Sequence, residues 1–316
     1  MRVVSLLPSA TEIMGALGAV EHLVGVTHEC DWPPVVTSRA RVTTSAVDST
    51  RAPAHVDARV RELASSGTSL YALRERLIRE LHPDLILTQA LCEVCAVHEG
   101  DVRTLAAALE PAPLVITLSA STLEGVLDDI RRVGTAVDRA DEAEELLDGL
   151  RARLAAVHAT LKAARAPRPR VALVEWGDPV FTGGHWVPEM IQRAGGVDPI
   201  GKPGEQSRTI AVAELRDADP EIVIIAPCGY GLARASEEGR RLVSLPQWSW
   251  AASRPVWALD ANALASRPGP RLVEGIETLA RIFNPSLFSP LDPAHAAAGP
   301  SPRRGATRAP LRDPSS

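Results

Sequence analysis

The side chains that could do chemistry gather in a few short loops of the 316-residue sequence. Residues 25–34, GVTHECDWPP, place His28, Glu29, Cys30 and Trp32 directly after an apolar run. Imidazole, carboxylate and thiolate groups in such a loop could bind a metal ion, and an indole ring could stack on a flat ligand. No catalytic triad, phosphate-binding loop or carboxylate pair stands out, so we expect no enzyme of a known type.

Further reactive side chains follow other apolar segments. They are Cys92, Glu93 and Cys95 in ALCEVCAVHEG, Glu175 and Trp176 in VEWGD, His185 and Trp186 in TGGHW, Cys228 in APCGY, and Arg267 in ASRPGP. All four cysteines and three of the six tryptophans of the chain lie in these loops and in residues 25–34. A single cysteine or tryptophan there is often a buried apolar residue, but their shared position predicts one ligand-binding cleft.

The pattern of apolar residues places these loops at the ends of predicted strands. Strand-like runs occur at residues 2–7, 23–27, 85–89, 114–118, 170–176, 221–227 and 256–260. Helical patterns between them include residues 56–64, 70–81, 187–194 and 232–243. This alternation predicts an α/β protein with parallel sheets, in which ligands bind beyond the carboxyl ends of the strands.

A long amphipathic stretch separates the two halves. Residues 121–166 are charged and rich in leucine and alanine, which predicts one long helix, with a break near residues 138–141, that spans two lobes. We therefore expect an N-terminal lobe at 1–120 and a C-terminal lobe at 167–288. Residues 289–316 are rich in Pro, Ala, Gly and Ser and predict a disordered tail.

Composition and charge exclude some partners. The formal net charge is −5 and the arginines form no basic stripe, so we expect no nucleic acid partner. No apolar run approaches the roughly 18 residues of a membrane-spanning helix, so we expect that the chain is not an integral membrane protein. We also expect a monomer. Residues 1–19 favour a strand, a turn and a helix over a secretory signal, so the chain as written is expected in the cytoplasm. A true start further upstream would make it extracytoplasmic.

Four longer segments resemble one protein family. They are VVSLLPSATEIMGALGAVEHLVGVTHECDWPP, HPDLILTQ, VFTGGHWVPEMIQRAGG and SRPGPRLVEGIETLARI. These segments are similar to the substrate-binding proteins of cobalamin and iron-chelate ABC importers, and the motifs DWPP and EWGDPVFTGGHW are similar to the cobalamin-binding branch. The resemblance implies two Rossmann-like lobes joined by one long helix. It also implies a flat ligand held between the lobes, little closure on binding and no catalytic machinery.

The loops and the resemblance together define an expected ligand site. Its residues are His28, Glu29, Cys30, Trp32, Glu93, Glu175, Trp176, His185, Trp186 and Arg267. The indole rings would face cobalamin or a related corrinoid, and a histidine, His28 or His185, would ligate its metal. Arg267 would pair with an acidic group of the ligand or with Glu175. The resemblance further implies an ABC permease partner, on which Glu99 and Glu189 would dock.

Two alternatives involve the cysteines. Cys30, Cys92, Cys95 and Cys228 could together bind zinc or an iron–sulfur cluster, in a cytoplasmic metalloprotein or enzyme. The CxxC pair is half of such a site, whereas the two solitary cysteines would lie on opposite lobes. In an exported form of the protein, Cys92 and Cys95 could instead form a disulfide bond.

Overall fold

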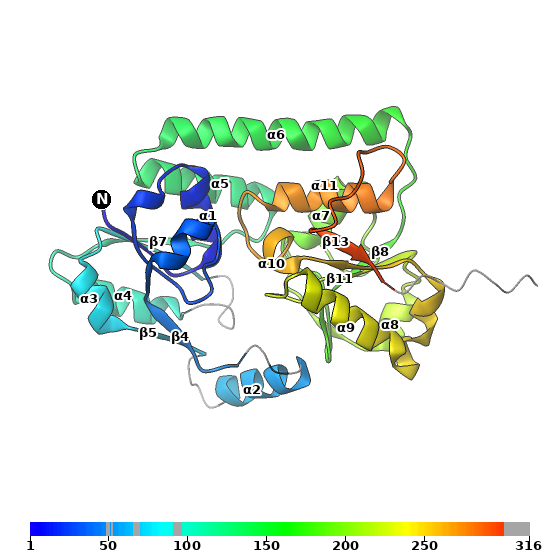
Figure 1. Cartoon of the computed structure of the whole chain (residues 1–316), viewed down its shortest axis with the longest axis horizontal. Helices are drawn as coiled ribbons and strands as arrows, with labels where there is room; N and C mark the ends of the chain where they lie inside the picture. The colour runs from blue at the N-terminus through cyan, green and yellow to red at the C-terminus, as the bar shows by residue number, and fades with distance from the viewer. Residues whose placement is uncertain (49–50, 52, 66–69, 91–96, 300–316) are drawn as a thin grey trace, which may run out of the picture.

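Two α/β lobes lie side by side beneath one long helix (Figure 1). The structure is a computed structural model, and it describes residues 1–48, 51, 53–65, 70–90 and 97–299. Each lobe has a sheet built around parallel strands, which confirms the predicted fold class. The carboxyl ends of these strands position the candidate site.

The sheet of the first lobe has five parallel strands in the order β3-β2-β1-β6-β7. Their bounds are β1 Val3–Ser5, β2 Leu23–Val26, β3 Ala40–Arg41, β6 Leu85–Gln89 and β7 Leu114–Leu118. Successive side chains of a strand point to opposite faces, so Val3 packs into one core and Val4 into another. The sheet is therefore buried on both faces, as the nearly continuous apolar runs predict.

Helices cover both faces of this sheet. The helix α1 (Pro8–Ala16) packs on one face, while α3 (Glu75–Leu81) and α4 (Glu99–Ala107) pack on the other. An antiparallel ribbon of β4 (Thr43–Ser45) and β5 (Tyr71–Leu73) lies beside them. The helix expected over 70–81 is thus shorter than predicted, because its first residues pair with β4. The helix α2, Pro53–Ser65, lies between the two strands of the ribbon in the chain.

The second lobe has a mixed sheet in the order β10-β9-β8-β11-β12-β13. The strands are β8 Val171–Gly177, β9 Val180–Thr182, β10 Thr209–Ile210, β11 Ile222–Ile225, β12 Val256–Leu259 and β13 Ala296–Ala298. Only β8, β11 and β12 are parallel, and the other three pair antiparallel. The helices of this lobe are α7 Val187–Arg193, α8 Val212–Asp217, α9 Leu232–Ser244, α10 Ala261–Leu264 and α11 Leu272–Phe283. Short 3-10 helices occur in both lobes, at η1 Val20–His22 and η2 Pro34–Ser38 in the first and η3 Pro246–Ser253 in the second.

The strand β13 corrects the prediction of a disordered tail from residue 289. Residues 296–298 form a ladder with β12, and Ala296 is buried. Three alanines have a weak preference for strand, so only the pairing with β12 holds them in this conformation. Residues 300–316 lie outside the described residues.

A helical hairpin connects the lobes, where one long helix with a break near residues 138–141 was expected. Its two helices, α5 (Leu123–Ala136) and α6 (Ala140–Ala163), pack against each other. The break occurs at residues 137–139, near the predicted position. A Cβ on Gly134 would lie 2.5 Å from the Ala143 Cβ, so the close approach of the two helices requires glycine there.

The helix α6 spans both lobes. It has 24 residues and is therefore about 36 Å long. Leu147 and Leu150 lie in the core of the first lobe, whereas Val157 lies in the core of the second. The single helix α6 thus contributes to two cores and ties the lobes together (Figure 1).

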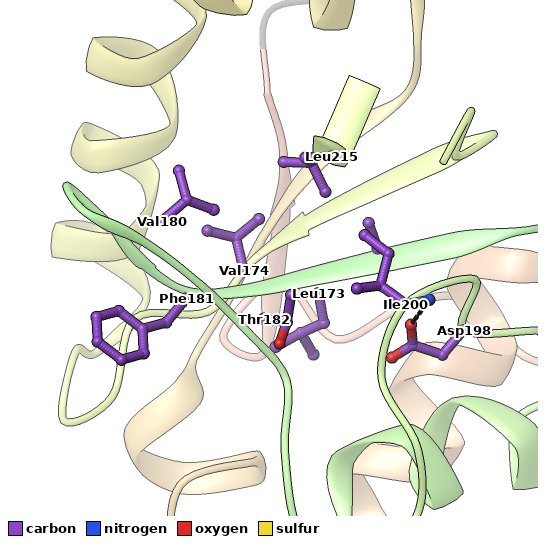
Figure 2. Close-up of a pocket in the computed structure, with 9 residues that line it drawn as sticks. Leu173, Val174, Val180, Phe181, Thr182, Asp198, Ile200 and Leu215 are labelled. Atoms are coloured by element: carbon purple, nitrogen blue, oxygen red, sulfur yellow. Dashed lines mark hydrogen bonds between the residues drawn. The ribbon is translucent and has the colours of Figure 1, made fainter. Parts of the chain in front are cut away.

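A small space inside the second lobe is too tight for a ligand. It is lined by Ala172, Leu173, Val174, Val180, Phe181, Thr182, Asp198, Ile200 and Leu215 (Figure 2). The space has no room for a water molecule, and none of the predicted ligand-binding residues lines it. It is a packing gap within the lobe.

Replacement of Asp198 at the edge of this space by asparagine is expected to raise the thermal unfolding midpoint at pH 7. The Asp198 Oδ1 accepts hydrogen bonds from the N–H groups of Ile200 (2.9 Å) and Gly201 (2.7 Å), and an amide oxygen can accept both. Burial raises the pKa of the carboxyl above its ordinary 3.8, so ionisation at neutral pH destabilises the folded state. The gain should vanish below pH 3.8, where the carboxyl is protonated in both states. Calorimetry at several pH values checks this, and an unchanged or lower midpoint at pH 7 contradicts it.

Candidate ligand-binding site

One edge of the first sheet carries the first set of predicted residues. The strands β1 and β2 are parallel neighbours, so the segments that follow them leave the sheet at the same edge. Arg41 fixes the segment after β2, because its guanidinium donates to the carbonyl oxygens of Thr27 (2.8 Å) and Cys30 (2.7 Å). The loop that contains His28 is therefore anchored by a side chain of the next strand.

The imidazole ring of His28 is fixed through one of its two nitrogens, and the other nitrogen takes no part in that contact. Its Nδ1 lies 2.8 Å from the Thr43 Oγ1, and its backbone N–H donates to the same oxygen. Its Nε2 lies 3.9 Å from the Glu29 carboxylate, and the Tyr71 ring is 5.5 Å away between centroids. Burial, and then the charge of Arg41, lowers the pKa of the imidazole. A neutral imidazole that donates through Nδ1 leaves the lone pair of Nε2 for a metal.

Cys30 points into the core, which corrects its predicted role as a ligand or metal contact. It is 1% exposed, and its Sγ lies 3.1 Å from the Thr11 Oγ1 and 3.3 Å from the Thr27 Oγ1. Burial raises the pKa of the thiol. A buried thiol with a raised pKa is a poor thiolate ligand, so Cys30 acts as a small apolar core residue.

Arg267 contacts protein carboxylates of the first lobe, where Glu175 or a ligand acid was expected. Its Nη1 donates to Glu12 (2.8 Å) and Asp31 (2.6 Å), and its Nη2 donates to the Glu29 carbonyl oxygen (3.2 Å). Burial opposes ionisation of Asp31, but the hydrogen bond and charge of Arg267 outweigh it and lower the pKa of that carboxyl. Arg267 is only 7% exposed and its guanidinium is bound by protein groups, which corrects its predicted place in the ligand site.

Trp32 remains available on the surface of the first lobe. It is 45% exposed, and the Arg271 guanidinium lies 5.2 Å from the centroid of its ring. An exposed indole held by one cation can still offer a flat apolar face.

Glu175 and Trp176 occupy the end of β8 in the second lobe. The Glu175 carboxylate accepts hydrogen bonds from the Gly184 N–H (3.2 Å) and the Ser207 hydroxyl, so it holds the glycine turn to the strand. The Trp176 ring packs edge-on against Tyr230, with 5.5 Å between centroids. The Trp176 Nε1 has no hydrogen-bond partner among the described residues.

The two neighbours that follow the glycine turn, His185 and Trp186, have different surroundings. His185 is partly exposed, its Nδ1 has no hydrogen-bond partner among the described residues, and burial lowers the pKa of its ring. Trp186 is 5% exposed, and its Nε1 donates to the Ala265 carbonyl oxygen (2.8 Å). Trp186 is therefore a core residue, which corrects its predicted place in the ligand wall.

The described residues give no support to a cysteine metal site. No group of three or more His, Cys, Asp or Glu residues in this part of the chain could hold a metal ion. Cys228 is exposed and free, whereas Cys30 is buried in the other lobe. Cys92, Glu93 and Cys95 lie outside the described residues, so their predicted roles stay predictions.

The two carboxylates expected to dock on a permease both have partners within the protein. Glu99 accepts hydrogen bonds from the Thr117 hydroxyl (2.6 Å) and Arg103 (2.8 Å), which lower its pKa. Glu189 accepts the Leu123 N–H (3.0 Å) at the start of α5 and pairs with Arg193. The Glu189 side chain is 17% exposed and that of Glu99 is 29% exposed, so Glu99 is the more accessible of the two.

Three residues beside the site were missed by sequence reasoning. Glu12 and Arg271 contact each other across the lobes, and Tyr71 lies against His28. The sequence did contain a signal for Glu12, because it is a carboxylate within the apolar segment SATEIMGALG. If this helix packs against the sheet, the carboxylate is buried and needs a hydrogen-bonding partner. Tyr71 was hidden because its segment was assigned to a helix.

Comparisons with known proteins agree with this architecture. Residues 3–250 match the sequence model of a family described as periplasmic binding protein. The structure is similar to that of a periplasmic heme binding protein from Pseudomonas aeruginosa, with a TM-score of 0.71 and 25% identity over 94% of this chain and 97% of the other. None of the curated proteins compared matches the chain.

Two further structures share the fold. The periplasmic vitamin B12 binding protein of Vibrio cholerae has a TM-score of 0.60 and 21% identity over 91% of this chain and 98% of its own. A periplasmic heme-binding protein from Roseiflexus sp. has a TM-score of 0.64 and 21% identity over 91% and 99%. At this identity the likeness shows the fold alone.

The family match covers the first lobe, the helical hairpin and most of the second lobe. Among the described helices, none combines the length and apolar character needed to cross a membrane. On the strength of the match over residues 3–250, this chain belongs to the periplasmic binding protein family.

Proposed function

We propose that this protein is the substrate-binding component of an ABC importer and carries a cobalt or iron tetrapyrrole, either a corrinoid such as cobalamin or a heme. The observation that carries the proposal is the state of His28. Its ring is partly exposed at the carboxyl edge of the first sheet, its Nδ1 is held by Thr43, and its lowered pKa keeps it neutral. A neutral imidazole with one nitrogen anchored is the usual axial ligand of such a metal.

Other side chains suit the rest of such a ligand. Trp32 offers an exposed flat face, as a macrocycle requires. In the second lobe, the partly exposed rings of His185 and Trp176 would add to the walls of the pocket. A pocket for such a ligand combines apolar walls with a few polar contacts.

The family and its solved relatives support this assignment. Two of the similar structures are heme-binding proteins and one is a vitamin B12 binding protein, and both ligands are flat metal tetrapyrroles. A binding protein of this family works outside the cytoplasm with an ABC permease, so we place this protein there in place of the cytoplasmic location first expected. Glu99 is our candidate for the permease contact. The alternative of a cysteine metalloprotein or enzyme is not favoured, because Cys30 lies in the core.

Titration of the purified protein with cobalamin and, separately, with heme tests the proposal. A saturable, equimolar change in the absorbance spectrum with one of them supports a tetrapyrrole carrier and identifies the ligand. Elemental analysis accompanies the titration. Stoichiometric zinc or iron in the purified protein, with no response to either ligand, would contradict the proposal.

Replacement of His28 by alanine is expected to remove the axial ligand and weaken binding at least about tenfold, because the metal–imidazole bond is lost. The spectrum of any remaining complex should shift to that of a ligand without imidazole. The control is His158→Ala, because His158 is exposed on α6. Equal affinity and equal spectra for the two variants would exclude His28 as the metal ligand.

A further inference from the structure

A set of charged and polar side chains joins the two lobes beside the candidate site, and we name it the junction network. Its members are Glu12 and Asp31 of the first lobe and Asn262, Arg267 and Arg271 of the second. The Glu12 carboxylate accepts from Arg267 (2.8 Å) and from two nitrogens of Arg271 (2.9 and 2.6 Å). Two guanidinium groups of one lobe thus converge on one carboxylate of the other.

The centre of the junction network is closed to water. Glu12 is 3% exposed and Arg267 is 7% exposed. Beside them Val273, at the start of α11, packs into the core of the first lobe. If the lobes moved apart here, a buried ion pair would break and apolar surface would be uncovered, and both changes cost free energy.

Arg267 has contacts that Arg271 lacks. Besides Glu12, it binds the Asp31 carboxylate (2.6 Å) and the Glu29 carbonyl oxygen (3.2 Å). Asn262 donates to the other Asp31 oxygen (3.2 Å). The segment of residues 29–31, which directly follows His28, is therefore held by the opposite lobe.

We infer that Arg267 is a positioning residue that fixes the two lobes relative to each other and holds the loop of residues 28–32 in its ligand-binding conformation. Arg267 does not touch the ligand. It acts through Glu12, which sets the lobe arrangement, and through Asp31, which sets the loop. The second effect rests on the proposed function, whereas the first can be measured without any ligand.

Pulsed EPR on the ligand-free protein tests the lobe arrangement. Spin labels at Arg76→Cys on α3 and Arg240→Cys on α9 report the inter-lobe distance, since both positions are exposed. Serine replaces Cys92, Cys95 and Cys228 in this background, and Cys30 stays because it is buried. We expect Arg267→Met to broaden the distance distribution about twofold, because open arrangements become populated. Arg267→Lys should restore part of the narrow distribution.

The matched control is Arg254→Met. Arg254 is partly buried, and like Arg267 it binds a carboxylate, Asp219 (2.6 Å), and a carbonyl oxygen, that of Pro220 (3.1 Å), but all within the second lobe. It should leave the distance distribution unchanged. If Arg267→Met and Arg254→Met give equally narrow distributions and differ only in thermal stability, Arg267 has a merely structural role and the inference is overturned.

Asp31→Asn tests the loop and remains informative should Arg267→Met fail to fold. Asp31 is exposed, and its replacement leaves the bond between Glu12 and Arg267 intact. We expect an unchanged inter-lobe distance but about tenfold weaker tetrapyrrole binding, because the competent loop conformation is less populated. Unchanged affinity would overturn the role of Arg267 in the loop. If no variant and no wild type binds a tetrapyrrole while the distances respond as expected, the proposed function fails and the junction network stands.

Discussion

Replacement of Glu12 by alanine is expected to lower the free energy of unfolding by about 3 kcal/mol, because removal of one partner leaves buried positive charge uncompensated. Arg271 would lose its carboxylate partner, and Arg267, which is 7% exposed, would keep only Asp31 and the Glu29 carbonyl oxygen. Unfolding in urea, followed by circular dichroism, measures the difference.

The control for Glu12→Ala is Glu80→Ala. Glu80 forms an ion pair on the surface of α3 with Arg76, and their side chains are 57% and 94% exposed. Exposed pairs contribute little, so this variant should stay within about 0.5 kcal/mol of the wild type. Glu12→Gln should lie between the two, since the amide keeps the shape and one acceptor oxygen. A loss for Glu12→Ala as small as that for Glu80→Ala would show that the junction network does not stabilise the fold.

Much of the fold could be predicted because the central strands are buried on both faces. The run at 85–89 coincides with the central strand β6, which is buried along most of its length. The run at 114–118 coincides with the edge strand β7, because a short β-branched run between helical segments favours a strand. The short strands β9, β10 and β13 have two or three residues each, and none was expected. Their conformation depends on pairing with distant segments, which no local pattern records.

For the candidate site, the sequence predicted which loops lie at the carboxyl ends of the strands. It did not predict which side chains of these loops are buried. The order of strands and loops was enough to bring His28 and Trp176 to the carboxyl ends of strands. Whether a side chain in such a loop faces the core or the surface depends on what packs against it. That is why Cys30 and Trp186 are buried, whereas Trp32 is exposed. Arg267 is a related case, because its partner Glu12 lies 255 positions away in the chain.

The second large effect is expected at Gly275 in α11. A Cβ built on Gly275 would lie 2.1 Å from the Leu264 carbonyl oxygen and 2.8 Å from the Met190 Cε. The first contact is with backbone, so α11 or α10 must move. We expect Gly275→Ala to lower the free energy of unfolding by about 3 kcal/mol, the upper part of the range for overpacked cores. Because Arg271 directly precedes α11 in the chain, the same movement should weaken its bond to Glu12 and broaden the inter-lobe distance distribution.

Gly149→Ala in α6 is the matched control, because it makes the same chemical change inside another helix. Nothing lies within 4 Å of a Cβ built on Gly149, which borders a groove between α6 and the end of α1. There only the helix preference of alanine counts, so the free energy of unfolding should rise by about 0.5–1 kcal/mol. Opposite signs for the two variants would show that the close packing of α11 on α10, and not glycine itself, sets the cost at Gly275. A stabilising Gly275→Ala would mean that α11 can shift freely, and the rigid placement of Arg271 on Glu12 would lose its basis.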